Sequence, residues 1–179
     1  MITQLTLFLK LVLVHLPDAL KCMIALWGIH LINMLSGYAL NRFGIIPRFL
    51  PSLIWGPTLA PLLHANTNHI SYNSLPLFIL LSALFSMGMV NAFSIIITCV
   101  YLAGILTWLF GREGCHIGSS ALVMSLMGFF AYNAYARPDI TSMTILILLL
   151  YYFGSLFFSF IPTDEQISFE GELFGLISG

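Results

Sequence analysis

The sequence predicts an all-α, polytopic membrane protein: a bundle of six transmembrane helices with a long structured loop after the first span. Of its 179 residues, 59% are hydrophobic and 7% are charged, and the mean hydropathy is +0.99. Soluble domains carry about 25% charged residues, so the chain lies outside that class. Apolar runs close to spanning length are separated by short polar breaks, which indicates several membrane crossings.

The first 21 residues are predicted to be an interfacial or extra helical segment ahead of a six-helix membrane domain over 22–179. The segment is apolar, but it contains Lys10 and His15 and Pro17 follows them. A helix lying in the membrane interface tolerates such interruptions. A cleavable signal peptide is an alternative, although the segment lacks a clear small-residue cleavage site.

The six spans follow from the apolar runs. They are predicted at 22–40, 67–86, 89–110, 119–136, 140–160 and from about 168 onward. The long loop, 41–66, contains four prolines and two arginines, which exclude one continuous helix there. A crossing needs about 20 residues, so the last helix either stops within the membrane or the chain was trimmed. Lysines and arginines divide evenly between the two sides, so charge does not orient the bundle.

Charge and cysteine content exclude several other classes of function. The formal net charge is −1 and no basic run occurs, so no nucleic-acid partner is indicated. The three cysteines, Cys22, Cys99 and Cys115, are widely spaced and form no metal or redox motif. We interpret them as packing residues and predict no metal and no cofactor.

A first polar cluster, "HANTNHISYN", opens the second predicted span. His69 and Asn73 lie four residues apart and therefore share one helical face, whereas His64 falls in the preceding loop. The three side chains could meet at the mouth of the bundle. Zinc binding is weakly supported, because the paired-histidine helix motif needs a four-residue step and a glutamate. The alternative is that these residues cap the helix and face the interface.

A second cluster, "GREGCHIGSSALVMSLMGFF", runs from a glycine-rich loop into the fourth predicted span. It places serine at a helix N-terminus, where free N–H groups can hold an anion or steady an oxyanion. This position suits a nucleophile. The alternative is that Ser119 caps the helix and that the small residues allow close helix packing.

Taken together, these motifs resemble the rhomboid family of intramembrane serine proteases. The pattern His64-x4-His69-x3-Asn73 precedes Gly118-x-Ser120, and glycines 171 and 175 form a stripe in the last span. The stretches "FGIIPR", "HIGSS" and "EGELFG" add to the likeness, which covers about 22 to 179.

The resemblance implies a serine hydrolase that cleaves transmembrane substrate helices near the membrane surface. Ser120 would be the nucleophile, and Asn73 would help to form the oxyanion hole. Supporting positions would be His64, His69, Gly118 and Ser119. The loop after the first span would lie partly in the membrane, and the fifth span would act as a movable gate. Partners would be a transmembrane helix and the lipid bilayer, and the compact form is most like bacterial members, which implies a multi-pass protein of a bacterial inner membrane.

The catalytic histidine of the family's Ser–His dyad would stand directly after Gly171, where this chain has Glu172. Histidine titrates near neutral pH, whereas a carboxylate starts near 4.3 and rises on desolvation. Loss of a dyad base commonly costs several orders of magnitude in rate. We therefore expect little or no proteolysis. The glycine spacing still lets the sixth span approach the fourth closely, so Glu172 could hydrogen-bond Ser120.

Smaller departures point the same way. Ala121 replaces the usual glycine after the serine, and Met124 stands where an aromatic residue usually supports the base. His116 and His69 are alternative bases, both disfavoured, the first as a loop residue and the second because it already has a role. His15 and His30 are interpreted as ordinary interfacial or packing residues.

Two functions from different classes follow. The first is a protease scaffold that Glu172 renders inactive or strongly impaired. The second is a non-enzymatic rhomboid-like pseudoprotease that binds transmembrane helices. Retention of the other motif residues favours the first, because a long-standing binding protein has no need of the whole set. A small transporter would show an internal repeat and broken helices, and neither is found.

Overall fold

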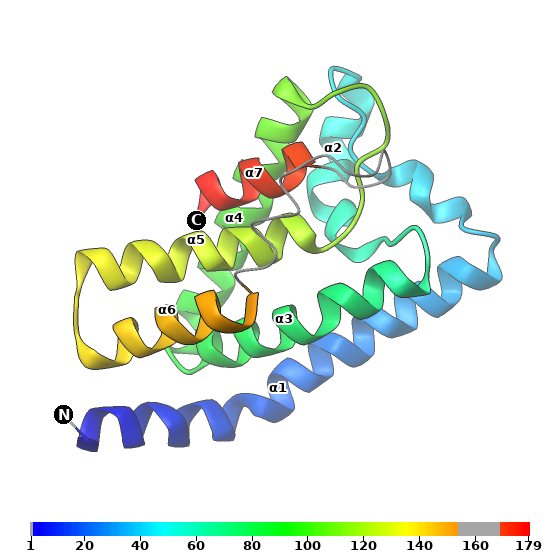
Figure 1. Ribbon diagram of the computed structural model, residues 1–179. Coiled ribbons are helices and arrows are strands. Elements are labelled where there is room, and N and C mark those ends of the chain that lie inside the picture. Colours follow the sequence, from blue (N-terminus) through cyan, green and yellow to red (C-terminus); the bar gives the residue numbers. More distant parts are fainter. Residues whose placement is uncertain (1, 154–168) are drawn as a thin grey trace.

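The computed structural model describes residues 2–153 and 169–179 (Figure 1). The regular secondary structure of these residues is helical, without strands, which confirms the predicted all-α class. In chain order the helices are α1 (Ile2–Leu35), η1 (Ala39–Phe43), α2 (Leu50–Leu59), η2 (Ala60–Leu62), α3 (Thr67–Phe85), α4 (Met89–Phe110), α5 (Ser120–Ala136), α6 (Ile140–Phe153) and α7 (Phe169–Ser178). The elements η1 and η2 are short 3₁₀ helices.

Three of the predicted spans agree with α3, α4 and α5 to within about a residue at each end. The first was wrong at its C-terminal end: α1 stops at Leu35, because Gly37 and Tyr38 adopt left-handed φ values of 66° and 62°. Its N-terminal half runs without interruption through Pro17, so no helix break marks the predicted boundary after residue 21. The later part of the fifth predicted span lies outside the described residues.

Length and composition single out α4 among the described helices. It is the one helix there that is both long and apolar enough to cross a membrane by these two criteria. The count of six spans stays a prediction.

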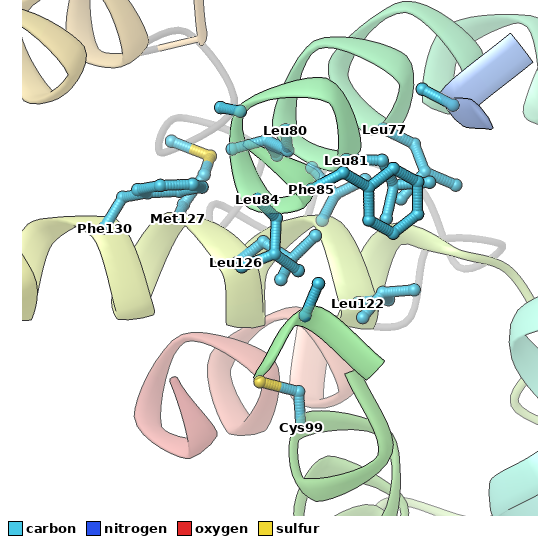
Figure 2. Packing of buried hydrophobic residues seen from close by; sticks show 14 of the residues in the cluster. Leu77, Leu80, Leu81, Leu84, Phe85, Cys99, Leu122, Leu126, Met127 and Phe130 are labelled. Atoms are coloured by element: carbon cyan, nitrogen blue, oxygen red, sulfur yellow. The ribbon is translucent and has the colours of Figure 1, made fainter. Parts of the chain in front are cut away.

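The fold is organised around α5, which lies between α3 on one side and α7 on the other (Figures 1 and 2). Buried side chains between α3 and α5 form the main hydrophobic core. Its members include Ile70, Leu77, Leu80, Leu84 and Phe85 of α3 and Leu122, Val123, Met124, Leu126, Met127 and Phe130 of α5. Met23 and Leu26 of α1 and Cys99 of α4 also belong to it.

The interface between α5 and α7 is built differently, from small residues. A Cβ added at Gly175 would collide with the carbonyl oxygen of Ala121, and one added at Gly179 would collide with that of Ser125. The two helices therefore touch backbone to backbone, as small residues allow in membrane bundles. The Ser125 and Ser178 hydroxyls also hydrogen-bond at 2.8 Å.

The loop after α1 is structured, as predicted, and it is fastened to the far end of α4. Ile45 and His116 exchange two backbone hydrogen bonds of 3.0 and 2.8 Å, which form an isolated antiparallel bridge. Arg48 adds a 2.8 Å bond from its Nη1 to the carbonyl oxygen of Gly111. Further down, Pro57 of α2 packs on Gly104 of α4, where an added Cβ would lie 2.8 Å from the proline Cβ. These contacts fix the segment that leads into α5.

All three cysteines are free thiols. Cys99 is buried in the core and Cys22 is half-buried against it. Cys115 is exposed, and its Sγ donates to the carbonyl oxygen of Asn41 at 3.1 Å.

Candidate functional site

A sharp turn at Gly118 places Ser120 as the first residue of α5. Gly118 has φ of +119°, a conformation that L side chains rarely adopt. A side chain there would also strike the ring of His69, whose Cε1 would lie 2.7 Å from the added Cβ. The Gly118 N–H donates to the carbonyl oxygen of Ala60 at 2.9 Å, which holds the turn. Glycine is thus required two residues before the serine.

The two adjacent serines have different surroundings. Ser119 occupies the N-cap position of α5, but its side chain makes no capping hydrogen bond. Its hydroxyl instead lies 3.1 Å from Nε2 of His64, and its backbone N–H donates to the same nitrogen at 3.3 Å. Ser119 is therefore the N-cap residue by position, as considered, but its side chain does not form a capping hydrogen bond. Ser120, in contrast, lines a cavity, and its hydroxyl has no hydrogen-bond partner among the described residues.

His64 is a buried, neutral residue in the loop ahead of α3. It has no exposed surface, and burial, followed by the neighbouring His69 and His30, lowers its pKa to about 3. Because Nε2 accepts from the Ser119 N–H, the ring proton is assigned to Nδ1. His64 thus fastens the loop to the start of α5 as a hydrogen-bond acceptor.

His69 and Asn73 share one face of α3, as the sequence predicted. Asn66 caps this helix through a 2.9 Å bond from the His69 N–H to its Oδ1, so capping is not the role of the histidines. The His69 ring packs edge to face on His64 with centroids 5.1 Å apart. The Asn73 side chain is buried, and its Nδ2 donates to the carbonyl oxygen of His69 at 3.0 Å.

The cavity beside Ser120 lies where the loop after α1, α4, α5 and α7 converge. Its lining includes Gly118, Ser120 and Ala121 at the start of α5, His116 from the preceding loop, and Gly171 from α7. The first turn of α7 therefore reaches the same space as the candidate nucleophile.

Glu172 is buried, with 7% of its surface exposed, in that first turn of α7. The contacts of Gly175 with Ala121 and of Gly179 with Ser125 advance together along both helices, so α7 runs parallel to α5. Glu172 precedes Gly175 by three residues and shares its helical face. Following this register backward brings Glu172 to the N-terminal end of α5, where Ser120 begins the helix.

The alternative base His116 has a structural role. It is 8% exposed, it belongs to the bridge with Ile45, and its Nε2 lies 2.9 Å from the carbonyl oxygen of Arg112. Met124 is 2% exposed and belongs to the hydrophobic core. His15 of α1 lies 3.1 Å from Asp18, far along the chain from the cluster.

Two features near the site were missed by sequence reasoning. His30 of α1 is 3% exposed, and its ring lies 6.3 Å from that of His64, so it extends the histidine cluster into α1. Arg112, after α4, pairs with Glu170 of α7 at 3.4 Å between Nε and Oε1. No local sequence pattern predicts either contact, because each joins segments that are far apart in the sequence. Among the described residues, no group of three or more histidines, cysteines or acidic residues could hold a metal ion.

Comparison with known proteins gives a consistent set of matches. The model of the rhomboid domain family matches residues 51–179. An uncharacterized protein of Mycobacterium tuberculosis is 31% identical over 165 residues, covering 86% of this chain and 68% of the relative. An uncharacterized protein of Mycobacterium leprae is 30% identical over 172 residues, covering 89% of this chain and 66% of the relative. No solved structure matches the chain.

Proposed function

Because the chain belongs to the rhomboid family, and is thus an integral membrane protein, we propose that it has the scaffold of an intramembrane serine endopeptidase. Ser120 would be the nucleophile. Glu172 would abolish or strongly impair hydrolysis. The substrate would be a transmembrane helix of another protein, cut near the membrane surface. We further infer six crossings from the apolar runs of the sequence. We also infer a bacterial inner membrane, which the mycobacterial origin of the relatives supports.

The reaction would begin when Oγ of Ser120 attacks the scissile carbonyl carbon and passes its proton to the base at position 172. The oxyanion of the tetrahedral intermediate would be stabilised by N–H groups at the start of α5, helped by the side chains of His69 and Asn73. The base then protonates the leaving amine, and water hydrolyses the acyl-enzyme by the same steps. The turn at Gly118 and the cavity beside Ser120 support this arrangement.

Glu172 is poorly suited to that base role for three physical reasons. A carboxylate of ordinary basicity takes a serine proton less readily than an imidazole does at neutral pH. After the transfer, an imidazole carries a positive charge that stabilises the nearby oxyanion, whereas a carboxylic acid is neutral. A carboxylate before the transfer also adds a negative charge where the oxyanion must form. We therefore expect binding geometry to persist while the chemical step fails.

The observation that carries the proposal is the backbone contact between α5 and α7. Gly175 meets Ala121, the residue directly after Ser120, so the first turn of α7, with position 172, lies toward the N-terminal end of α5. Such close packing is what a Ser–base pair requires. This close packing is present although the base position holds Glu172 in place of the family's histidine.

The test compares the unaltered chain with its Glu172→His variant. We expect the variant to gain at least about 100-fold in the rate at which a fluorophosphonate labels it and in cleavage of a transmembrane substrate, the contribution of a positioned general base. Peptide mapping of the adduct identifies the labelled serine. As an independent check, Ser120→Ala should abolish labelling and Ser119→Ala should not. The matched control is Glu113→His, a histidine introduced at an exposed glutamate in the loop after α4.

Two outcomes contradict the proposal. If Glu172→His gains neither labelling nor cleavage, the protease scaffold is not functional. If the unaltered chain already cleaves in a Ser120-dependent manner, the proposed impairment of hydrolysis is wrong. A shift of the onset of that activity to higher pH would then implicate Glu172 as the base.

The second candidate, a pseudoprotease that binds transmembrane helices, is favoured by one observation. Glu172 is buried in the first turn of α7, next to Gly171, which lines the cavity beside Ser120. A position without a function has no need of a buried polar group. This function predicts that helix binding depends on the cavity and is indifferent to Ser120.

A further inference from the structure

The segment that carries Glu172 has two faces with different partners. Glu172, Gly175 and Gly179 lie on the face that packs on α5. Glu170 and Phe174 lie four residues apart and share another face. On that face, Phe174 packs on Phe110 at the end of α4, with ring centroids 6.0 Å apart, and Glu170 pairs with Arg112 two residues further on. The first turn of α7 is thus held from two sides.

The Arg112 side of this contact stands on a braced loop. The carbonyl oxygen of Arg112 lies 2.9 Å from Nε2 of His116, which is itself bridged to Ile45. The preceding residue, Gly111, donates to the carbonyl oxygen of Thr107 at 2.8 Å and accepts from Nη1 of Arg48 at 2.8 Å. The arginine therefore starts from a fixed backbone position.

Glu170 is the more confined partner. Its side chain is 19% exposed, whereas that of Arg112 is 43% exposed, and its Oε2 is buried with no hydrogen-bond partner among the described residues. A carboxylate that is mostly removed from solvent needs the charge beside it. The N-terminus of α7 also favours an acidic residue in its first turn.

We propose that the Arg112–Glu170 ion pair positions the first turn of α7, and with it the side chain at position 172, against Ser120. Glu170 and Glu172 are two residues apart and point to different sides of the helix. Holding Glu170 to the loop therefore limits rotation and fraying of the turn that presents position 172. The glycine face fixes how closely α7 approaches α5, and the ion pair fixes how its first turn is oriented.

The positioning role rests on the proposed function only for its effect on catalysis. Two measurements therefore distinguish the positioning of α7 from catalysis by Ser120. In the Glu172→His background, Arg112→Gln or Glu170→Gln should lower the fluorophosphonate labelling rate of Ser120 about tenfold. The double variant should be labelled no more slowly than either single variant, because each single change already removes the same ion pair. The charge-reversed pair, Arg112→Glu with Glu170→Arg, should recover part of the rate. Glu113→Gln and Arg137→Gln, exposed residues on the two loops flanking α5, are the matched controls and should change nothing.

The second readout needs no catalysis. In a chain with Cys22→Ala, Cys99→Ala and Cys115→Ser, the thiol introduced by Glu172→Cys should react slowly with a charged thiosulfonate reagent. Arg112→Gln should speed that reaction several-fold, and raised ionic strength should act in the same direction, since a partly exposed pair is screened by salt. An unchanged rate overturns the positioning role. Faster thiol reaction together with no labelling in Glu172→His would sustain the positioning role and reject the protease scaffold.

Discussion

At the scale of single residues, the site depends on a few positions whose surroundings admit one residue type. Gly118 combines a positive φ with direct contact to the His69 ring, so alanine there would be strained twice. Ser119 and His64 form a buried polar contact that joins the start of α5 to the loop ahead of α3. These residues were identified from the sequence as candidates, but the partner of Ser119 was not. Spacing along the chain does not report a hydrogen bond across 55 positions.

The buried His64 gives a prediction about pH. Its pKa is lowered from 6.5 in the unfolded chain to about 3 in the folded protein, because burial disfavours the charged ring. Below pH 6.5 the unfolded state binds a proton that the folded state does not, so stability falls as pH decreases toward 3. The limiting slope is about 1.4 kcal/mol per pH unit. His64→Gln should flatten the pH dependence of thermal unfolding between pH 6 and 4.

The control for that measurement is His15→Gln, a change at a partly exposed histidine outside the cluster. The His15→Gln variant should lose stability with falling pH as steeply as the unaltered chain does. If the stability of His64→Gln falls as steeply below pH 6.5 as that of the unaltered chain, the pH dependence arises from another group.

At the scale of elements, α3, α4 and α5 were predicted well because each is an apolar run bounded by polar or glycine residues. The end of α1 was predicted less well, since Gly37 and Tyr38 shortly after Leu35 adopt left-handed conformations that the sequence does not reveal. The glycine stripe of α7 did predict a close approach to α5. The face that carries Glu170 and Phe174 was missed, because its partners lie at the far end of α4.

The contact between α5 and α7 gives a second prediction, with a control inside the chain. Gly175→Ala should destabilise the protein by about 1–3 kcal/mol, the usual cost of overpacking, because the added Cβ meets the Ala121 backbone. Gly28→Ala in α1 has no atom within 4 Å of the added Cβ. It should be neutral or stabilising by up to about 1 kcal/mol, since alanine favours a helix over glycine. Thermal unfolding in detergent measures both.

If the two alanine variants shift the unfolding temperature equally, close packing is not what requires glycine at 175. In Gly175→Ala combined with Glu172→His, we also expect fluorophosphonate labelling to fall below that of Glu172→His alone. The displaced α7 would move the base away from Ser120.

At the scale of the whole molecule, the parts that would bind a substrate helix and the part that would do chemistry are separable. The turn at Gly118, the cavity beside Ser120 and the packing of α7 on α5 are all in place. In the proposed function, the chemical step is impaired chiefly by one side chain, Glu172, with smaller departures at Ala121 and Met124. This separation follows from the fold, because helix packing depends on small residues and backbone contact, whereas proton transfer depends on the identity of one group.

The separation predicts that the unaltered chain binds a transmembrane helix without cutting it. A fluorescent synthetic transmembrane peptide in micelles should show the same Kd, within about twofold, for the unaltered chain, for Ser120→Ala and for Ser120→Ala with Glu172→His. Only Glu172→His with Ser120 retained should release product. Binding energy common to substrate and transition state sets Kd, whereas the base acts on the transition state alone. A Kd that changes tenfold on Glu172→His would mean that the carboxylate itself disturbs substrate binding, and that the loss of function begins before the chemical step.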